Sequence, residues 1–150
     1  MNASKERRAN GPGYGRWLLH PFFISIGGAL LIAAFASDIM YTRTWLMQWA
    51  NASEWLIAVG LLFALVAAIV LAVELVIGTA RPVSWLDFIL LAAAAVLSIV
   101  NAFVHSRDAW TTVVPEGIWL SGISALLLVI VGLRGWSVTA RPALKAGDRS

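Results

Sequence analysis

Four apolar stretches, each about as long as a lipid bilayer is thick, constrain this chain more than any other feature. They cover residues 17–41, 54–79, 85–105 and 118–136. About 20 apolar residues in a helix cross the hydrocarbon core, and a helix satisfies all of its own backbone groups in lipid. The chain is 60% hydrophobic and 13% charged, which is about half the charge of a typical soluble domain. The sequence therefore predicts an integral membrane protein with four transmembrane helices.

The connections between these stretches are short, at residues 42–53, 80–84 and 106–117. Short connections place consecutive helices side by side and antiparallel. We therefore expect an all-α, sequential four-helix bundle over residues 17–137, with tails at 1–16 and 138–150. Small residues spaced four apart indicate helix contact faces in lipid. Such series are Ser25, Ala29, Ala33 and Ser37 in the first helix, and Gly60, Ala64, Ala68 and Ala72 in the second.

The basic residues are divided unequally between the two sides of the predicted bundle. Arg43 and Arg107 lie in the first and third loops, and the other nine of the eleven lie in the tails, at the end of the fourth helix or at Arg81. By the positive-inside rule, both termini are predicted to be cytoplasmic and the first and third loops periplasmic, in a bacterial inner membrane. The eight tryptophans fall near helix ends, as an aromatic belt requires.

Polar side chains within the spans gather toward both ends. The predicted cytoplasmic cluster is His20, Glu74, Arg81 and Asp87, and the predicted periplasmic cluster is Asp38, Asn101 and His105. Because an ionisable group costs about 2.5–3.5 kcal/mol at a helix centre, each such residue is a candidate site. We interpret both clusters as hydrogen-bonding groups that fix helix register. The alternative is a proton or ligand site, including a proton or small-solute carrier that uses Glu74.

The motifs of soluble enzyme chemistry do not occur in this sequence. It has no cysteine, no phosphate-binding glycine loop and no His-Glu-x-x-His or Gly-x-Ser-x-Gly pattern, so we expect neither catalysis by the chain alone nor a metal site. His20 and His105 are predicted at opposite membrane surfaces, too far apart to ligate one haem, although His105 with Met40 or Met47 stays open. We expect no cofactor, with a quinone in an apolar groove left open. The basic residues suit lipid headgroups rather than nucleic acid.

The two predicted outer loops are rich in residues that protein interfaces favour. These are Trp45, Met47, Trp49, Arg107, Asp108, Trp110 and Pro115. They predict a docking surface for a periplasmic protein or another membrane subunit, and a homo-oligomer stays open. The alternative is that these aromatic side chains only occupy the lipid interface.

Several residues together resemble a bacterial family of four-helix membrane proteins known as domain of unknown function 2231. They are His20-Pro21, Asp38, Glu74 and the segment 107–115, Arg-Asp-Ala-Trp-Thr-Thr-Val-Val-Pro, with Gly117. The resemblance covers about residues 17–136 and implies no established activity. It implies a partner among respiratory oxidoreductases, because members occur beside periplasmic quinoprotein sugar dehydrogenases and cytochromes c. Members continue a Gly-Trp pair into Glu, Tyr and His, whereas Gly135-Trp136 here precedes Ser-Val-Thr.

These observations predict a non-catalytic membrane subunit or anchor that docks a periplasmic partner. Two alternatives remain: an electron-transfer membrane protein that binds haem or quinone, and the carrier that uses Glu74.

Overall fold

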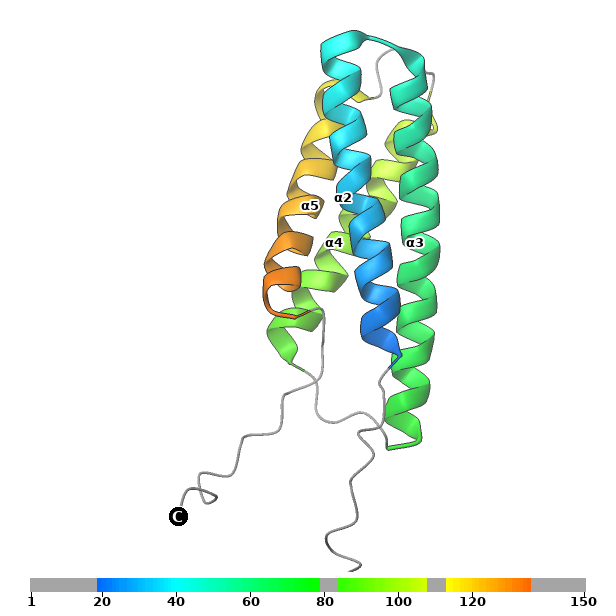
Figure 1. The fold of residues 1–150 in the computed structure, drawn as a ribbon, viewed down its shortest axis with the longest axis vertical. Helices are drawn as coiled ribbons and strands as arrows, with labels where there is room; N and C mark the ends of the chain where they lie inside the picture. The colour runs from blue at the N-terminus through cyan, green and yellow to red at the C-terminus, as the bar shows by residue number, and fades with distance from the viewer. Residues whose placement is uncertain (1–18, 79–83, 108–112, 136–150) are drawn as a thin grey trace, which may run out of the picture.

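Four long helices make up the described part of the chain, which comprises residues 19–78, 84–107 and 113–135 of a computed structural model. They are α2 (His20–Thr44), α3 (Met47–Val76), α4 (Trp85–His105) and α5 (Ile118–Leu133), with a short π-helical turn, η1 (Val113–Gly117), before α5 (Figure 1). Each of α2, α3, α4 and the combined segment Val113–Leu133 is long and apolar enough to cross a membrane. The prediction of an all-α membrane four-helix bundle is confirmed. The predicted tails, 1–16 and 138–150, lie outside the described residues.

The helices run antiparallel in sequence order, and α2 occupies a central position among their contacts. It packs most extensively against α3 and also contacts α5, which in turn packs against α4 (Figure 1). One apolar core contains residues from all four helices: Leu31, Ala34, Ile57, Ala94 and Leu128. Large apolar side chains also cover the outside, among them Leu62, Leu65, Ile69, Val96 and Leu126. Lipid is the solvent for such a surface, so the helices contact the bilayer directly.

The connection between α2 and α3 is much shorter than the sequence predicts. Helix α2 continues to Thr44 and α3 begins at Met47, so Trp45 and Leu46 alone connect them in place of residues 42–53. The prediction was wrong because it equated the end of the apolar stretch with the end of the helix. Residues 47–53 include the polar residues Gln48, Asn51 and Ser53 but no glycine or proline, so the helix continues beyond the apolar stretch. The other differences in helix bounds are three residues or fewer, and α4 begins and ends as predicted.

Trp45 closes this tight turn in a backbone conformation that L-residues rarely adopt. Its φ is 53° and its ψ is 24°, and its N–H donates to the carbonyl oxygen of Tyr41 at 2.8 Å. Glycine is the usual residue at such a left-handed cap, and any other residue costs about 1–2 kcal/mol there. The indole is 63% exposed and has an edge-on contact with the Tyr41 ring. Burial of this side chain therefore does not explain why a tryptophan occupies the turn.

Helices α2 and α3 approach each other closely where two glycines meet. A Cβ atom on Gly27 would lie 3.0 Å from the Gly60 carbonyl oxygen and 3.3 Å from the Ala64 nitrogen. In the small-residue series predicted for α2, Ser37 is buried but Ala29 is exposed, whereas the glycines Gly27 and Gly28 outside the series are buried. A spacing of four residues between small side chains does not by itself identify which face of α2 meets α3.

We expect Gly27→Ala to lower the stability of the bundle by about 1–3 kcal/mol, because the added methyl group meets α3 backbone atoms that cannot move alone. Thermal unfolding in detergent measures the effect. Gly122→Ala is the matched control, since its methyl group would meet only the edge of the Phe35 ring, at 3.1 Å, and a ring can turn aside. Equal melting temperatures for the two variants would contradict this account of the α2–α3 contact.

Candidate functional site

Buried ionisable side chains occupy both ends of the bundle. We call the end with the α2–α3 turn the Trp45 end; it also contains the C-terminus of α4 and the η1 turn. The opposite end, where α2 and α4 begin and α3 and α5 finish, is the His20 end (Figure 1). Each end has a histidine that contacts a carboxylate of another helix.

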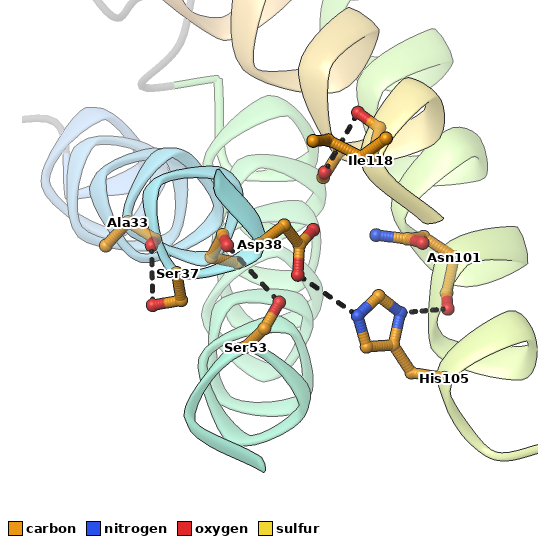
Figure 2. A network of polar contacts seen from close by, with 9 residues as sticks. Ala33, Ser37, Asp38, Ser53, Asn101, His105 and Ile118 are labelled. Atoms are coloured by element: carbon orange, nitrogen blue, oxygen red, sulfur yellow. Dashed lines mark hydrogen bonds and ion pairs between the residues drawn. The ribbon is translucent and has the colours of Figure 1, made fainter. Parts of the chain in front are cut away.

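At the Trp45 end, His105 of α4 contacts Asp38 of α2 across the bundle. The His105 Nε2 atom lies 3.2 Å from Asp38 Oδ1, and its Nδ1 atom lies 3.1 Å from the main-chain oxygen of Asn101 (Figure 2). The Asp38 and Asn101 residues are 0% and 1% exposed, and His105 is also buried. The structure thus brings together the three residues of the predicted periplasmic cluster.

The hydrogen bonds of His105 determine the charge of this pair. A carbonyl oxygen can only accept, so Nδ1 must carry a proton. The contact between Nε2 and Asp38 then requires one further proton, held either by the imidazole or by the carboxyl group. The pair is an imidazolium with a carboxylate in the first case and two neutral groups in the second. Its net charge is zero either way, which makes a fully buried aspartate tolerable at the end of a membrane span.

Two oxygen atoms in this cluster have no hydrogen-bond donor among the described residues. They are Asp38 Oδ2 and Asn101 Oδ1, both buried. The neighbouring serines do not supply donors, because Ser37, Ser53 and Ser121 each donate to a main-chain carbonyl oxygen (Figure 2). These two acceptors are therefore unsatisfied within the described part of the chain.

A pocket of about 380 Å³ opens at the Trp45 end, beside this cluster. It lies between the first turns of α3 and the segment formed by the end of α4 and η1, and is lined by Met47, Gln48, Ala50, Asn51, Glu54, His105 and Val113. Gln48, Asn51 and Glu54 recur every three residues, so they lie along one side of α3. Glu54 is exposed and close enough to His105 to act on it electrostatically. The pocket combines exposed polar walls with a buried histidine.

Helix α3 is longer than the hydrocarbon core of a bilayer is thick. Its 30 residues correspond to about 45 Å, whereas the core is about 30 Å thick. The turns over residues 47–53, which contain Gln48, Asn51 and Ser53, precede the apolar stretch at this end. The more polar end of α3 is thus the end that bears the pocket.

At the His20 end, His20 and Glu74 form the most closely contacting buried pair. The His20 Nδ1 atom lies 2.5 Å from Glu74 Oε2, and the Leu19 N–H donates to Glu74 Oε1 at 2.6 Å. His20 Nε2 is buried and has no partner among the described residues. Of the predicted cluster of four, His20 thus pairs with Glu74, whereas Asp87 pairs with Arg134, directly after α5. Arg81 lies outside the described residues.

Arg134 is a charged side chain at the His20 end that the sequence analysis did not assign to a cluster. Its guanidinium group donates from Nε and from a terminal nitrogen to the two Asp87 oxygens. The hydrogen bond and charge of Asp87 raise the pKa of Arg134, so this arginine stays charged. The sequence places Arg134 near the end of the fourth helix, at the same predicted surface where Asp87 begins the third helix. That placement could have identified the pair. Gln48 and Asn51 were missed because their helical turns were taken for a loop, whereas Glu54 was treated only as the first residue of the second apolar stretch.

A second, apolar pocket of about 240 Å³ lies nearer the His20 end, between α2, α3 and α4. Its wall includes Ile24, Gly27, Ala67, Leu71 and Leu91. Helices α3 and α4 contact each other less than other neighbouring pairs do, and many of the lining residues are small. Loose packing between these two helices therefore accounts for the space.

The predicted docking residues are only partly available for contact with another protein. Trp45, Met47, Arg107 and Pro115 are exposed, whereas Trp49 is half-buried against the cluster of Tyr41, Ala50 and Val113. Trp49 is less accessible than predicted because α3 begins at Met47 and turns this side chain toward the bundle. Asp108 and Trp110 lie outside the described residues. Among the described residues, no group of three or more histidine, cysteine or acidic side chains could hold a metal ion.

Apolar helices of bilayer length, with their paired charges restricted to the two ends, define a polytopic membrane protein. The family described as Predicted membrane protein (DUF2231) matches residues 17–146. The chain therefore belongs to that family, as its resemblance predicted. No curated protein and no solved structure matches the chain.

We expect Asp38→Leu to lower the free energy of unfolding by about 1–3 kcal/mol, because it leaves the buried Nε2 atom of His105 without a partner. Asp38→Asn is the matched control. Its side-chain amide has nearly the same shape and can donate to a neutral His105, so we expect a smaller loss. Thermal unfolding in detergent measures both variants. Equal stability of wild type and Asp38→Leu would show that the contact is not stabilising.

Proposed function

We propose that this protein is a non-catalytic subunit or anchor of the bacterial inner membrane that binds a partner protein at its Trp45 end. The observation that carries the proposal is the pocket of about 380 Å³ at this end. If the outer side chains only occupied the lipid interface, their aromatic rings would suffice, and a concave polar surface beside them would have no role. Pockets of this size with a few convergent polar groups are typical of binding sites.

Exposed side chains beside the pocket support the same proposal. Trp45, Met47 and Arg107 are exposed and belong to the residue types enriched at the centres of protein interfaces. Trp45 also adopts a strained backbone conformation where glycine would fit without cost. Strained residues of this kind are commonly retained for function. A contact made by the indole with another molecule accounts for both its exposure and its position.

We further propose that the Trp45 end faces the periplasm. Its arginines are Arg43 and Arg107, whereas the other nine basic residues belong to the opposite side by sequence. The family resemblance makes a periplasmic respiratory oxidoreductase the candidate partner. Docking there would hold such an enzyme at the membrane surface without requiring chemistry from this chain.

The alternative functions have weaker support. As a haem ligand, His105 would have to give up one of two hydrogen bonds, and His20 lies at the opposite end of the bundle. In a carrier, Glu74 would have to leave His20 and the Leu19 N–H, and it lies at the end of α3 rather than at mid-membrane. The apolar pocket would accept a lipid acyl chain as readily as a quinone tail, so it does not favour electron transfer.

We expect Trp45→Gly to reduce recovery of the partner protein about tenfold or more in a pull-down from native membranes in mild detergent, as for an interface hot spot. Its melting temperature should stay close to wild type, because glycine relieves the left-handed strain. Trp85→Ala is the matched control: this tryptophan is 73% exposed and lies at the His20 end. A wild-type protein that purifies alone, or equal losses for the two variants, would refute the proposal.

The orientation can be tested separately because the chain has no cysteine. We expect a membrane-impermeant maleimide added to spheroplasts to label Arg107→Cys and to leave Arg7→Cys unlabelled until the membrane is permeabilised. Arg107 lies outside the described helices, and Arg7 belongs to the predicted N-terminal tail. Labelling of Arg7→Cys in intact spheroplasts would place the N-terminus outside and remove the Trp45 end from the periplasm.

A further inference from the structure

We propose that the apolar pocket between α2, α3 and α4 holds one acyl chain of a membrane phospholipid. The pocket has a volume of about 240 Å³ and lies toward the His20 end, so its occupant is independent of the docking proposed for the Trp45 end. Lipid that only covers the outer surface exchanges freely, whereas this chain enters between the helices and fills a space that the side chains leave open. It is therefore a structural component of the bundle.

The pocket opens on a surface that lipid covers. Ala68 of α3 and Phe88 and Ala92 of α4 line it and are exposed. Ala67 and Leu128 also line it, but they are only 4% and 3% exposed. The pocket thus extends from the lipid-facing sides of α3 and α4 inward to the core. A bilayer lipid reaches it sideways, without leaving the hydrocarbon region.

The depth of the pocket matches that of the acyl chains in one leaflet. Trp85 begins α4 and is 73% exposed, and a tryptophan in this position marks the membrane–water interface. The α4 part of the lining extends from Phe88 to Ala95, three to ten residues further along the helix. At 1.5 Å per residue this is about 5–15 Å inside the interface, and each leaflet contributes about 15 Å of hydrocarbon. The pocket therefore lies among the acyl chains at the His20 end.

The chemistry of the lining suits hydrocarbon. Every described residue that lines the pocket is a glycine or has an apolar side chain. A buried water needs about two to four polar partners, and an apolar cavity of about 150 Å³ in another protein stays dry and binds benzene. The ring of a quinone needs hydrogen-bond donors for its carbonyl oxygens, and the described lining residues provide no side-chain donor. A plain hydrocarbon chain has no such requirement.

The size of the pocket argues against a helix of a second copy or of a partner protein. A helix is about 10–12 Å wide with its side chains and rises about 5.4 Å per turn, so a single turn occupies more than the 240 Å³ of the pocket. Gly27, Gly28 and Ala64 leave this space because they are too short to fill it. Empty space forfeits the dispersion contacts of the atoms around it. An acyl chain is narrow, flexible and always present in a bilayer, so it restores those contacts.

An acyl chain in this pocket connects two helices that contact each other weakly. Helices α3 and α4 have less direct contact than the other neighbouring pairs. Leu71 of α3 and Leu91 of α4 both line the pocket, so one chain packs against both helices. We therefore expect bound lipid to stabilise the bundle.

Ala68→Leu tests the proposal, because its larger side chain fills the opening of the pocket. Ala58→Leu is the matched control, since Ala58 is also an exposed alanine of α3 but does not line the pocket. The proteins are purified in digitonin, whose rigid steroid body cannot replace an acyl chain, and the retained lipid is extracted and quantified by mass spectrometry. We expect Ala68→Leu to retain at least about fivefold less phospholipid than wild type and Ala58→Leu. Ala92→Leu, which fills the pocket from α4, should show the same loss.

Thermal unfolding of the delipidated proteins gives a second readout. Added palmitoyl-oleoyl-phosphatidylglycerol should raise the melting temperature of wild type and Ala58→Leu by about 3 °C or more, and that of Ala68→Leu by less than about 1 °C. Before lipid is added, Ala68→Leu should melt no lower than wild type, because the leucine fills empty space and Ala68 is exposed. The loss of lipid is then not a loss of folding.

Three results would overturn the proposal. Equal lipid retention by Ala68→Leu and Ala58→Leu, or an equal response of their melting temperatures to added lipid, would show that only ordinary surface lipid is bound. A quinone that is retained by wild type and lost with Ala68→Leu, in place of a phospholipid, would assign the pocket to the quinone. A dimer or a protein complex that dissociates with Ala68→Leu but not with Ala58→Leu would assign it to a protein contact.

Discussion

The inability of lipid to form hydrogen bonds governs how polar residues are arranged in this protein. A polar side chain within a span must find its partner inside the bundle. The serines do so in two ways: Ser37 donates to the Ala33 carbonyl oxygen of its own helix, whereas Ser124 of α5 donates to the carbonyl oxygen of Ala94 on α4. Ser98 and Ser124 also bond to each other at 2.8 Å. Each bond between helices fixes their register as well as satisfying a polar group.

The same constraint makes the carboxylates structural connectors. Glu74 of α3 pairs with His20 of α2, and Asp38 of α2 pairs with His105 of α4. Asp87 of α4 then pairs with Arg134, directly after α5. These three pairs connect the helices in the series α3, α2, α4 and α5. The Asp38–His105 pair matters most in this respect, because it bridges two helices whose backbones have little direct contact.

The helices are predicted well from the sequence, because the length of an apolar stretch is a local property. The contacts between helices are predicted poorly, because they depend on residues that lie far apart in the sequence. Helix α4 has the predicted bounds, since its apolar stretch and its helix coincide. Asp87 could have reached Arg81 or Arg134, both at the same predicted surface, and only the packing of α5 against α4 decides between them. The α2 face that meets α3 likewise depends on the rotation of the helix, which brings Gly27 and not Ala29 to the contact.

The candidate site was not predicted from the sequence for the same reason that the first loop was predicted to be too long. Residues 47–53 are helical, and only a helix places Gln48, Asn51 and Glu54 on one line opposite His105. Continuing α3 this far leaves two residues for the turn, and Trp45 in that turn has a left-handed backbone. The strained cap, the exposed indole and the polar pocket thus all belong to one extension of α3. The polar side chains of the pocket are thereby held on a rigid helix and not on a loop.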